Sequence, residues 1–456
     1  MKTKYIFLLT FFCSVTRGFA QTDSSYTLKQ CIDYALKHQA NYLNTTLDAE
    51  IAKARVGEVQ AIGLPQINGT VSLIENPKLR NMFFSKSNPF ASSFGDMGGE
   101  VSGNVLVAKN IFQLPSSGDA GATISQLLFD GSYFVGLKAA KAYQSLAQKS
   151  IEQSRIQTVE NVTKAYYLVL ITQERINRLN SIIATLDSTV RQSRVMYENG
   201  FIEKIDLDRL EVSLNNLLTD KSKFDSGLEI SKMLLKFQMG MPIDAPIMAA
   251  DSLALNSSES VLLKGTKANY NERVEYALLE NQKVLQSLDL KNVRAGYYPS
   301  IAAFASGGFT RQDEKFVNLF QYKWYSYSLM GINMNVPIFD GFGKHYKGQQ
   351  KKLELKKTEN QLFALRNLID MQVKQSEINV NNAIKTLEVQ EKNMSLATEV
   401  ARIVKIKYAE GVGTNIEVIN AEDALRDAQT NYYNALYDLL VAQLDYKKAL
   451  GTLATE

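Results

Sequence analysis

The most restrictive feature of this sequence is a pair of long stretches that contain neither glycine nor proline. One runs from Leu137 to Asn199 and the other from Gln349 to Glu410. Because proline breaks helices and glycine weakens them, these stretches predict uninterrupted α-helices. At ~1.5 Å per residue, a helix of roughly sixty residues reaches roughly 90 Å. No compact soluble domain needs a helix of that length.

The same landmarks occur twice in the chain, in the same order. Tyr197 to Gly200 recurs as Tyr408 to Gly411, and Glu211 recurs as Glu422, at one constant displacement. Each half is predicted to hold a helix of about thirty residues ending at a proline, two strand-like segments, a very long helix, a glycine turn and a second helix. Phe-Asp-Gly motifs mark the expected turns from strand to long helix: Phe129, Asp130 and Gly131 in the first half, and Phe339, Asp340 and Gly341 in the second. This order indicates an internal duplication.

The predicted domain organisation follows from the duplication. Residues 1–20 are expected to be a signal peptide and residues 21–241 the first structural repeat. Residues 242–269 are expected to be a linker or equatorial region, and residues 270–456 the second repeat.

The start of the chain has the features of a secretory signal peptide. Lys2 and Lys4 precede an apolar run that is far shorter than the ~20 residues of a membrane-spanning helix. Its removal, which also takes away Arg17, lowers the formal net charge from +4 to about +1. The remaining chain has no basic bias, which argues against nucleic acid as a partner. It retains a single cysteine, Cys31, which excludes an internal disulfide and a cysteine-based zinc site.

The predicted long helices carry the apolar spacing of coiled coils. Apolar positions from Ile176 to Val190 step alternately by three and four residues, and the same rhythm runs from Val418 to Ala442. Polar residues fill the positions between, as expected of helices with one wet face in the wall of a water-filled tube. The stripes alone fit an ordinary antiparallel helical bundle equally well.

Four segments with partial alternation of apolar and polar residues are the candidate strands. They contain glycine, serine, threonine and aromatic residues, as strands of membrane β-barrels do, although two soluble hairpins would have a similar pattern. They lie near Gln66 to Leu73, Ala120 to Phe129, Ser300 to Thr310 and Tyr325 to Phe339. The segment around Asn81 to Gly99 makes the first connection longer than its counterpart in the second half, and it is expected to be an enlarged outer loop.

Four strands cannot close a barrel by themselves. An open edge in hydrocarbon leaves backbone N–H and C=O groups unpaired, at a cost of several kcal/mol each. If these strands enter lipid, several chains must therefore share one barrel. Two chains would supply eight strands and three would supply twelve, and this reasoning permits either.

A family resemblance rests on the Leu-Pro and Tyr-Pro helix ends, the two Phe-Asp-Gly motifs, the two glycine-turn hairpins and the terminal Ala449 to Gly451. In this order they resemble the TolC family of outer membrane efflux proteins, across nearly all of the chain after residue 20. The resemblance implies an internally duplicated α+β fold with long antiparallel coiled-coil helices that form a periplasmic α-barrel. It also implies four strands per chain in a shared trimeric 12-stranded outer-membrane β-barrel, and a mixed belt near Pro242 to Asn269.

The same resemblance implies a function. The chain is expected to be an outer-membrane channel that extends into the periplasm, a passive exit duct for drugs or other exported substrates in a tripartite efflux or type I secretion system. Its implied partners are two further copies of itself in a homotrimer, a periplasmic adaptor protein, an inner-membrane pump and outer-membrane lipid. Two alternatives stay open, namely a metal-ion efflux channel of the same fold and a periplasmic coiled-coil scaffold or adaptor.

No catalytic, cofactor-binding or metal-binding residue is predicted. His38 and His345 are the only histidines, and no serine or cysteine nucleophile has a recognisable setting. The chain is therefore not expected to be an enzyme, and the energy for transport is expected to come from the partners.

The candidate functional residues lie around the two glycine turns, where a reversing chain needs a positive φ. By resemblance, Asp206 and Glu417 line the narrow periplasmic entrance of the channel, where copies from three chains would form a ring of carboxylates that attracts cations. Both residues also fit carboxylates in the first turn of a helix, where the helix dipole stabilises them. A further acid of the family's entrance is replaced here by Asn420. The residues expected to meet an adaptor are Tyr197, Asn199, Gly200, Phe201, Tyr408, Gly411, Val412 and Gly413.

Overall fold

The computed structural model describes residues 25–87, 100–108, 110, 112–251, 265 and 268–453. The predicted signal peptide, residues 1–20, lies outside the described residues. The chain divides into two compact units. The helical unit comprises Met1–Leu47, Lys149–Ala277 and Phe363–Glu456, and the sheet unit comprises Asp48–Gln148 and Leu278–Leu362. Each unit therefore takes segments from both predicted repeats.

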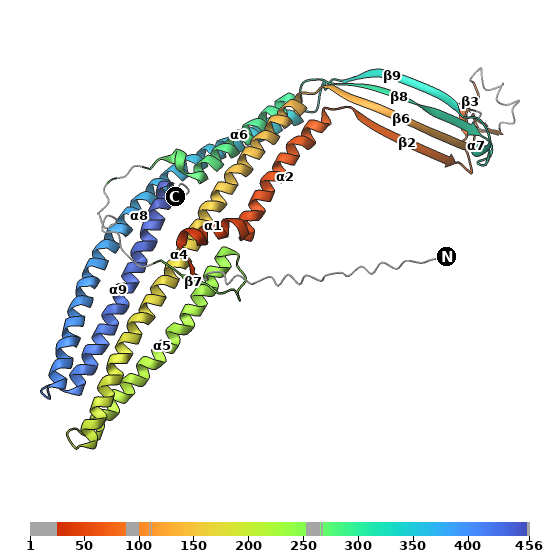
Figure 1. The fold of residues 1–456 in the computed structure, drawn as a ribbon. Coiled ribbons are helices and arrows are strands. Elements are labelled where there is room, and N and C mark those ends of the chain that lie inside the picture. Colours follow the sequence, from red (N-terminus) through yellow and green to blue (C-terminus); the bar gives the residue numbers. More distant parts are fainter. Residues whose placement is uncertain are drawn as a thin grey trace, which may run out of the picture. The chain divides into compact units, whose positions relative to one another are not determined.

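Four long helices dominate the helical unit. α4 (Gly131–Glu198) and α5 (Lys204–Met239) form one hairpin, and α8 (Gly343–Ala409) and α9 (Asn415–Leu450) form a second, as Figure 1 shows. The stretches that lack glycine and proline lie almost wholly within the single helices α4 and α8, as predicted. Among the described residues, no helix is both long enough and apolar enough to cross a membrane.

Glycine ends the second helix of each hairpin. Gly240 follows α5 with φ +70°, and Gly451 follows α9 with φ +84°. In this left-handed conformation the Gly240 N–H reaches the carbonyl of Phe237, and the Gly451 N–H reaches that of Lys448. A side chain at either position would be strained, which explains why glycine closes both halves of the chain.

The predicted coiled-coil stripes form the core of the helical unit. Leu186 on α4 and Val418 on α9 are each 1 % exposed, and they pack in one apolar cluster with residues of α5 and α8. Leu439, further along α9, is equally buried in a second cluster with residues of α4 and α8. Full burial of one such side chain contributes about 1.5–3 kcal/mol, so these stripes hold the two hairpins against each other.

The helix predicted before the first proline is broken into two. α1 (Leu28–His38) and α2 (Ala40–Ile62) meet at Gln39, whose backbone is extended with φ −72° and ψ 119°. Gln39 Oε1 accepts a hydrogen bond from the backbone N of Tyr42 at 2.7 Å, so this side chain caps the start of α2. The prediction of one continuous helix was wrong here, because apolar periodicity carries no signal for a single capping side chain. In the second half, a short 3₁₀ turn, η2 (Tyr270–Glu272), precedes α6 (Val274–Ala295).

Part of the predicted equatorial region is described. β1 (Ser25–Tyr26) pairs in parallel with β7 (Met248–Ala249). Asp251 Oδ2 then accepts hydrogen bonds from the backbone N of Leu28 at 2.9 Å and from the Tyr166 hydroxyl at 2.8 Å. These bonds tie the segment after α5 to α1 and to the middle of α4. Residues 252–264, 266 and 267 lie outside the described part of the chain.

The sheet unit contains one four-stranded antiparallel sheet in the order β2-β6-β8-β9. The strands are β2 (Gln66–Glu75), β6 (Ser116–Phe129), β8 (Ser300–Asp313) and β9 (Tyr325–Asn335). All four correspond to predicted strands. β9 ends before the predicted Phe339, because Pro337 has no N–H with which to continue the ladder.

The connection between β2 and β6 is not only a loop. Its described residues form a small antiparallel sheet in the order β3-β5-β4, made of β3 (Met82–Ser85), β4 (Glu100–Ser102) and β5 (Val105–Ala108). Gly103, with φ +62°, makes the turn between β4 and β5. The composition-based expectation of a plain loop missed the short runs of aromatic and β-branched residues that favour strands. Residues 88–99 of the predicted loop lie outside the described residues.

A charge network around the buried Glu160 joins α4 to α9. Glu160 accepts hydrogen bonds from Lys164 at 2.8 Å and from Lys448 at 2.6 Å, and Lys164 also lies 2.8 Å from Asp445. Burial opposes ionisation of Glu160, but the two lysines outweigh it and lower the pKa of this carboxyl below its usual 4.5. A depressed carboxyl pKa stabilises the fold above the unfolded value, and this contribution is lost as the pH falls through the folded pKa.

We expect Glu160→Gln to lower the thermal stability of the helical unit at pH 7, with the difference from the wild type narrowing as the pH falls below about 4.5. Circular dichroism melting at several pH values measures this. Glu152→Gln on the same helix, which loses only an exposed ion pair with Lys149, is the control and should change little. A pH-independent difference for Glu160→Gln would contradict the assignment.

Candidate functional site

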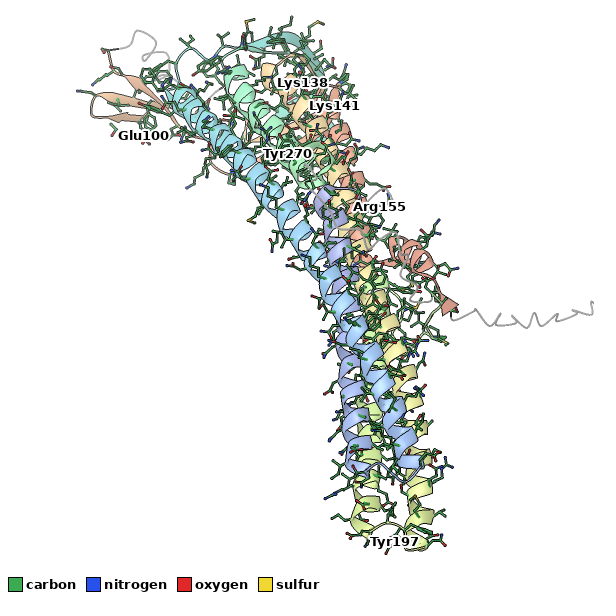
Figure 2. The ribbon with its side chains drawn as sticks, turned by 90° about the vertical axis from the view of Figure 1, so that its left-hand side faces the viewer. Glu100, Lys138, Lys141, Arg155, Tyr197 and Tyr270 are labelled. Atoms are coloured by element: carbon green, nitrogen blue, oxygen red, sulfur yellow. The ribbon has the colours of Figure 1, made fainter. Side chains whose placement is uncertain are left out.

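The two glycine turns form the free ends of the hairpins. Gly200 has φ +78° and Gly411 has φ +75°, and each turn is closed by a backbone hydrogen bond, from Phe201 N to Met196 O and from Val412 N to Lys407 O. Tyr197 marks the α4–α5 end in Figure 2. Among the described residues, no heavy atom outside the adjacent residues lies within 4 Å of the position that a Cβ would take on either glycine, so the positive φ, and not crowding, requires glycine at both turns.

The predicted adaptor-contact residues fall into two groups. Phe201 and Val412 are 78 % and 79 % exposed, and Tyr197 and Asn199 are exposed as well. Tyr408, in contrast, is buried, and its hydroxyl lies 2.7 Å from Ser193 Oγ on α4. This hydrogen bond links the end of α8 to the end of α4, so Tyr408 is part of the contact between the hairpins.

Gly413 is required by close packing. A Cβ at this position would lie 2.9 Å from the backbone N of Tyr408. The Gly413 N–H instead donates to the carbonyl of Lys407 at 3.1 Å, which brings the chain back against the last turn of α8. The turn after α8 is therefore tighter than sequence alone indicated.

The two predicted entrance carboxylates each lie in the first turn of a helix. Glu417 forms a capping box with Thr414, whose Oγ1 accepts from the Glu417 N–H at 3.3 Å. Asp206 lies in the first turn of α5 with Arg209 at 3.9 Å. Buried Asn415 donates from Nδ2 to the backbone O of Asp206 at 2.9 Å. The starts of α5 and α9 are thus joined directly, and both acids belong to one end of the helical unit.

An ion pair that the duplication repeats was missed by sequence reasoning. Arg194 on α4 lies 2.6 Å from Glu211 on α5, and Lys405 on α8 pairs with Glu422 on α9. The recurrence of Glu211 as Glu422 is visible in the sequence, and the cations precede them at matching positions. The side chains of the first pair are largely exposed, whereas the Glu422 side chain is only 3 % exposed. The duplicated ion pair therefore lies in a different environment in each hairpin.

The Phe-Asp-Gly motifs act as helix caps at the strand-to-helix turns. Asp130 Oδ1 accepts from the backbone N of Tyr133 at 2.8 Å at the start of α4, and Asp340 Oδ2 accepts from the backbone N of Lys344 at 3.0 Å at the start of α8. Gly131 packs against Ala295, where a Cβ would come within 3.0 Å of the carbonyl. Gly341 has φ +65°, so the second motif also needs glycine for its backbone conformation.

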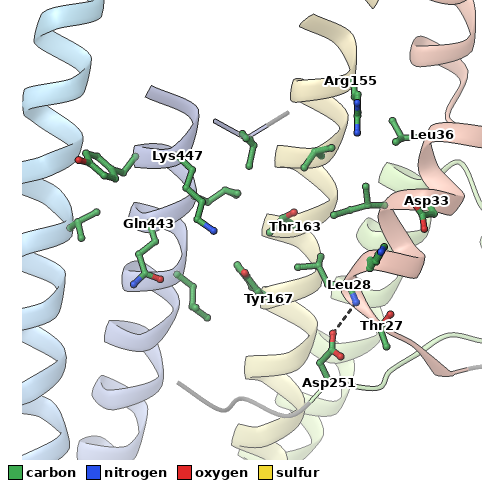
Figure 3. A pocket seen from close by; sticks show the side chains of 18 residues that line it. Thr27, Leu28, Asp33, Leu36, Arg155, Thr163, Tyr167, Asp251, Gln443 and Lys447 are labelled. Carbon is green, nitrogen blue, oxygen red and sulfur yellow. Dashed lines mark hydrogen bonds between the residues drawn. The ribbon is translucent and has the colours of Figure 1, made fainter. Parts of the chain in front are cut away.

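A cavity of about 610 Å³ opens between α1, α4 and α9. Figure 3 shows Arg155, Tyr167 and Lys447 around it, with the Leu28–Asp251 hydrogen bond on one wall. Its lining contains apolar side chains together with positively and negatively charged ones. None of the candidate functional residues predicted from the sequence lines it.

The four-stranded sheet has one apolar and one mainly polar face. Paired residues share a face, so Ile67, Ile124, Ala305 and Met330 form one row, with Asn68, Thr123, Ser306 and Leu329 in the next row on the opposite face. We call the first the apolar face, which also carries Val71, Leu73, Phe309, Ile332 and Met334. We call the second the polar face, which also carries Thr70, Ser72, Ser117, Asp119, Ser125, Thr310, Tyr327 and Asn333.

Long helical hairpins that continue into such a sheet define the class of outer-membrane export ducts. A model of the family described as "Outer membrane efflux protein" matches residues 31–229 and 277–452, well over half of the chain. The chain therefore belongs to the outer membrane efflux protein family.

Individual relatives agree with this assignment. Outer membrane protein TolC of Vibrio cholerae is 24 % identical over 360 residues, which cover 75 % of this chain and 80 % of that protein. Alkaline protease secretion protein AprF of Pseudomonas aeruginosa is 21 % identical over 340 residues, covering 73 % and 69 %. The crystal structure of outer membrane protein VceC from Vibrio cholerae matches the fold with a TM-score of 0.69 at 14 % identity, over 93 % of this chain and 96 % of VceC. The chain is an outer-membrane exit duct of efflux or secretion systems that extends into the periplasm.

The hydrogen bond between Tyr408 and Ser193 gives a local prediction. Tyr408→Phe should destabilise the hairpin ends by about 1–3 kcal/mol, because the buried Ser193 hydroxyl loses its partner. Amide hydrogen exchange over residues 404–413 should become faster by the factor that corresponds to this loss of free energy. Ser193→Ala should have a similar effect, and the double variant should be little worse than either single one. Fully additive effects would show that the two hydroxyls do not act as a pair.

Proposed function

We propose that three copies of this chain form a passive exit duct, with one shared β-barrel in the outer membrane and one shared helical barrel in the periplasm. The observation that carries this proposal is the four-stranded sheet. Within the described residues, β2 and β9 each have a single neighbouring strand in it. Each therefore presents an edge of backbone groups that hydrocarbon would leave unsatisfied, at several kcal/mol per group.

Exposed side chains support the insertion of this sheet into lipid. On the apolar face Val71, Met330 and Ile332 are 77 %, 81 % and 70 % exposed, which a single chain in water would not favour. Pairing β2 of one copy with β9 of the next would bury both edges and turn the apolar faces outward to lipid. Three copies give twelve strands, a size at which a barrel encloses a channel lined by the polar face.

The helices support the same assembly. α8 carries exposed apolar residues along its length, including Phe363, Met371, Ile378 and Val400, and α5 carries Ile230 and Phe237. Each lies at the spacing of a helical stripe and stays exposed within the part of the chain that the structure describes. Neighbouring copies would cover these stripes, as helices of one barrel wall cover each other.

We place the periplasmic entrance of the duct at the hairpin ends. Asp206 and Glu417 would lie there in three copies each, as a carboxylate ring that concentrates cations. The exposed Tyr197, Asn199, Phe201 and Val412 are the residues we assign to contact with a periplasmic adaptor. Gly200, Gly411 and Gly413 shape the turns, and Tyr408 holds the hairpins together from inside.

The duct itself would perform no catalysis. An adaptor and an inner-membrane pump would supply recognition and energy, and the channel would give drugs or secreted products a path to the exterior. The membership in an outer membrane family favours this function over a periplasmic scaffold, which would need no lipid-facing sheet.

Two neighbouring substitutions test the orientation of the sheet. Ile332→Arg places a charge on the apolar face, where an arginine costs about 2–4 kcal/mol per copy at the bilayer midplane and less toward the interfaces, and it should reduce the heat-modifiable trimer in outer-membrane fractions. Asn333→Arg places the same charge one residue further along β9 on the polar face, and trimer should persist. Equal loss of trimer from both variants, or none from either, would contradict the assigned faces.

A second test concerns the entrance. The double variant Asp206→Ala with Glu417→Ala should lower the cation-to-anion permeability ratio of the channel in planar bilayers by about twofold or more, because the entrance loses its carboxylates. Reversal potentials in a salt gradient measure the ratio. Asp220→Ala, which removes a half-buried acid further along α5, is the control. An unchanged ratio in the double variant would end the ring hypothesis and leave the fold untouched.

A further inference from the structure

One charged residue stands apart on the polar face of the sheet. β2, β6, β8 and β9 are described along their whole length, and Asp119 on β6 is the only charged side chain on this face of the four strands. Its row contains Ser72 on β2, Thr310 on β8 and Tyr325 on β9. The other charges of the strands, Glu75, Arg311 and Asp313, lie on the opposite face.

We propose that Asp119 is a second selectivity-determining residue of the duct, which makes the barrel lumen favour cations independently of the periplasmic entrance. This inference rests on the proposed trimer, in which the polar face lines the channel. Asp119 would then face the lumen in three copies. It lies near the end of the sheet that is remote from the Phe-Asp-Gly turn, and so near the outer mouth.

The carboxylate of Asp119 is held in place by Tyr327. The Tyr327 hydroxyl on β9 donates to Asp119 Oδ1 on β6 at 3.2 Å, across the intervening strand β8. The tyrosine ring reaches that far because it lies over Gly121, where a Cβ would come within 2.8 Å of the hydroxyl oxygen. Glycine at this position thus makes room for the ring, and Tyr327 is a positioning residue for Asp119.

The surroundings make this carboxylate electrostatically effective. Serine, threonine and asparagine side chains of the polar face solvate a passing ion without neutralising Asp119, and no cation of the four strands shares its face. Carboxylates that no neighbouring cationic side chain neutralises attract cations into a narrow lumen, over roughly the 8–10 Å Debye length of physiological salt. A ring of three would therefore raise the local cation concentration at the level of Asp119.

The experiment is a planar-bilayer measurement on the full mature chain, both with the natural entrance and with the Asp206→Ala and Glu417→Ala pair. Asp119→Asn should lower the cation-to-anion permeability ratio by about twofold or more in both backgrounds. Tyr327→Phe should lower it less, because the carboxylate remains but loses its fixed position. Adding Thr123→Asp to Asp119→Asn should restore the ratio, since Thr123 lies on the same face four residues along β6.

Glu75→Gln is the matched control. It removes one negative charge near the same end of the sheet, but on the apolar face, and glutamine can still accept the hydrogen bond that Glu75 receives from Ser116 at 2.5 Å. Its permeability ratio should equal that of the wild type. An unchanged ratio for Asp119→Asn in a conducting channel would overturn this inference alone. Absence of any channel from the wild-type protein would instead overturn the proposed duct.

Discussion

Within the described residues, the backbone groups at the two edges of the four-stranded sheet have no partner strand, and this shortage governs how both units of the chain can be stabilised. Hydrocarbon offers no hydrogen bonds, so β2 and β9 must find partners before the apolar face can meet lipid. The described part of one chain offers no further strand to either edge, and in the proposed trimer neighbouring copies would supply one. The long helices follow the same logic, because α8 and α5 carry apolar side chains that stay exposed within the described part of the chain. In the proposed trimer, neighbouring copies would cover these side chains as well as the strand edges.

The duplicated hairpins show how one inherited pattern serves two environments. Both turns use a left-handed glycine, and both hairpins place a cation on the long helix opposite a glutamate on the second helix. Arg194 and Glu211 stay largely exposed, whereas Glu422 is buried and its partner Lys405 is half-buried. An exposed ion pair contributes little to stability, while removing one partner of a pair with a buried charge is costly. Loss of the cation should therefore cost more in the α8–α9 hairpin than in the α4–α5 hairpin.

Much of the fold could be predicted, because its strongest signals are local. Stretches without glycine or proline gave α4 and α8, alternating segments gave the four strands, and the repeated landmarks gave the glycine turns. The errors arose where a side chain acts through one specific contact. Gln39 splits a helix by capping α2, and short strands around Gly103 order part of a segment whose composition indicates only a loop. Neither effect produces a periodic pattern of apolar residues in the sequence.

The candidate site divides in the same way. Local sequence was enough to identify the residues that flank the turns, because glycine is needed for a positive φ and a carboxylate is stabilised in the first turn of a helix. The folded chain was needed to see that Tyr408 faces inward to Ser193, that Asn415 joins the starts of α5 and α9, and that Tyr327 reaches Asp119 over Gly121. These contacts join residues far apart in the chain. Their existence depends on how helices and strands pack, and local sequence patterns do not encode that packing.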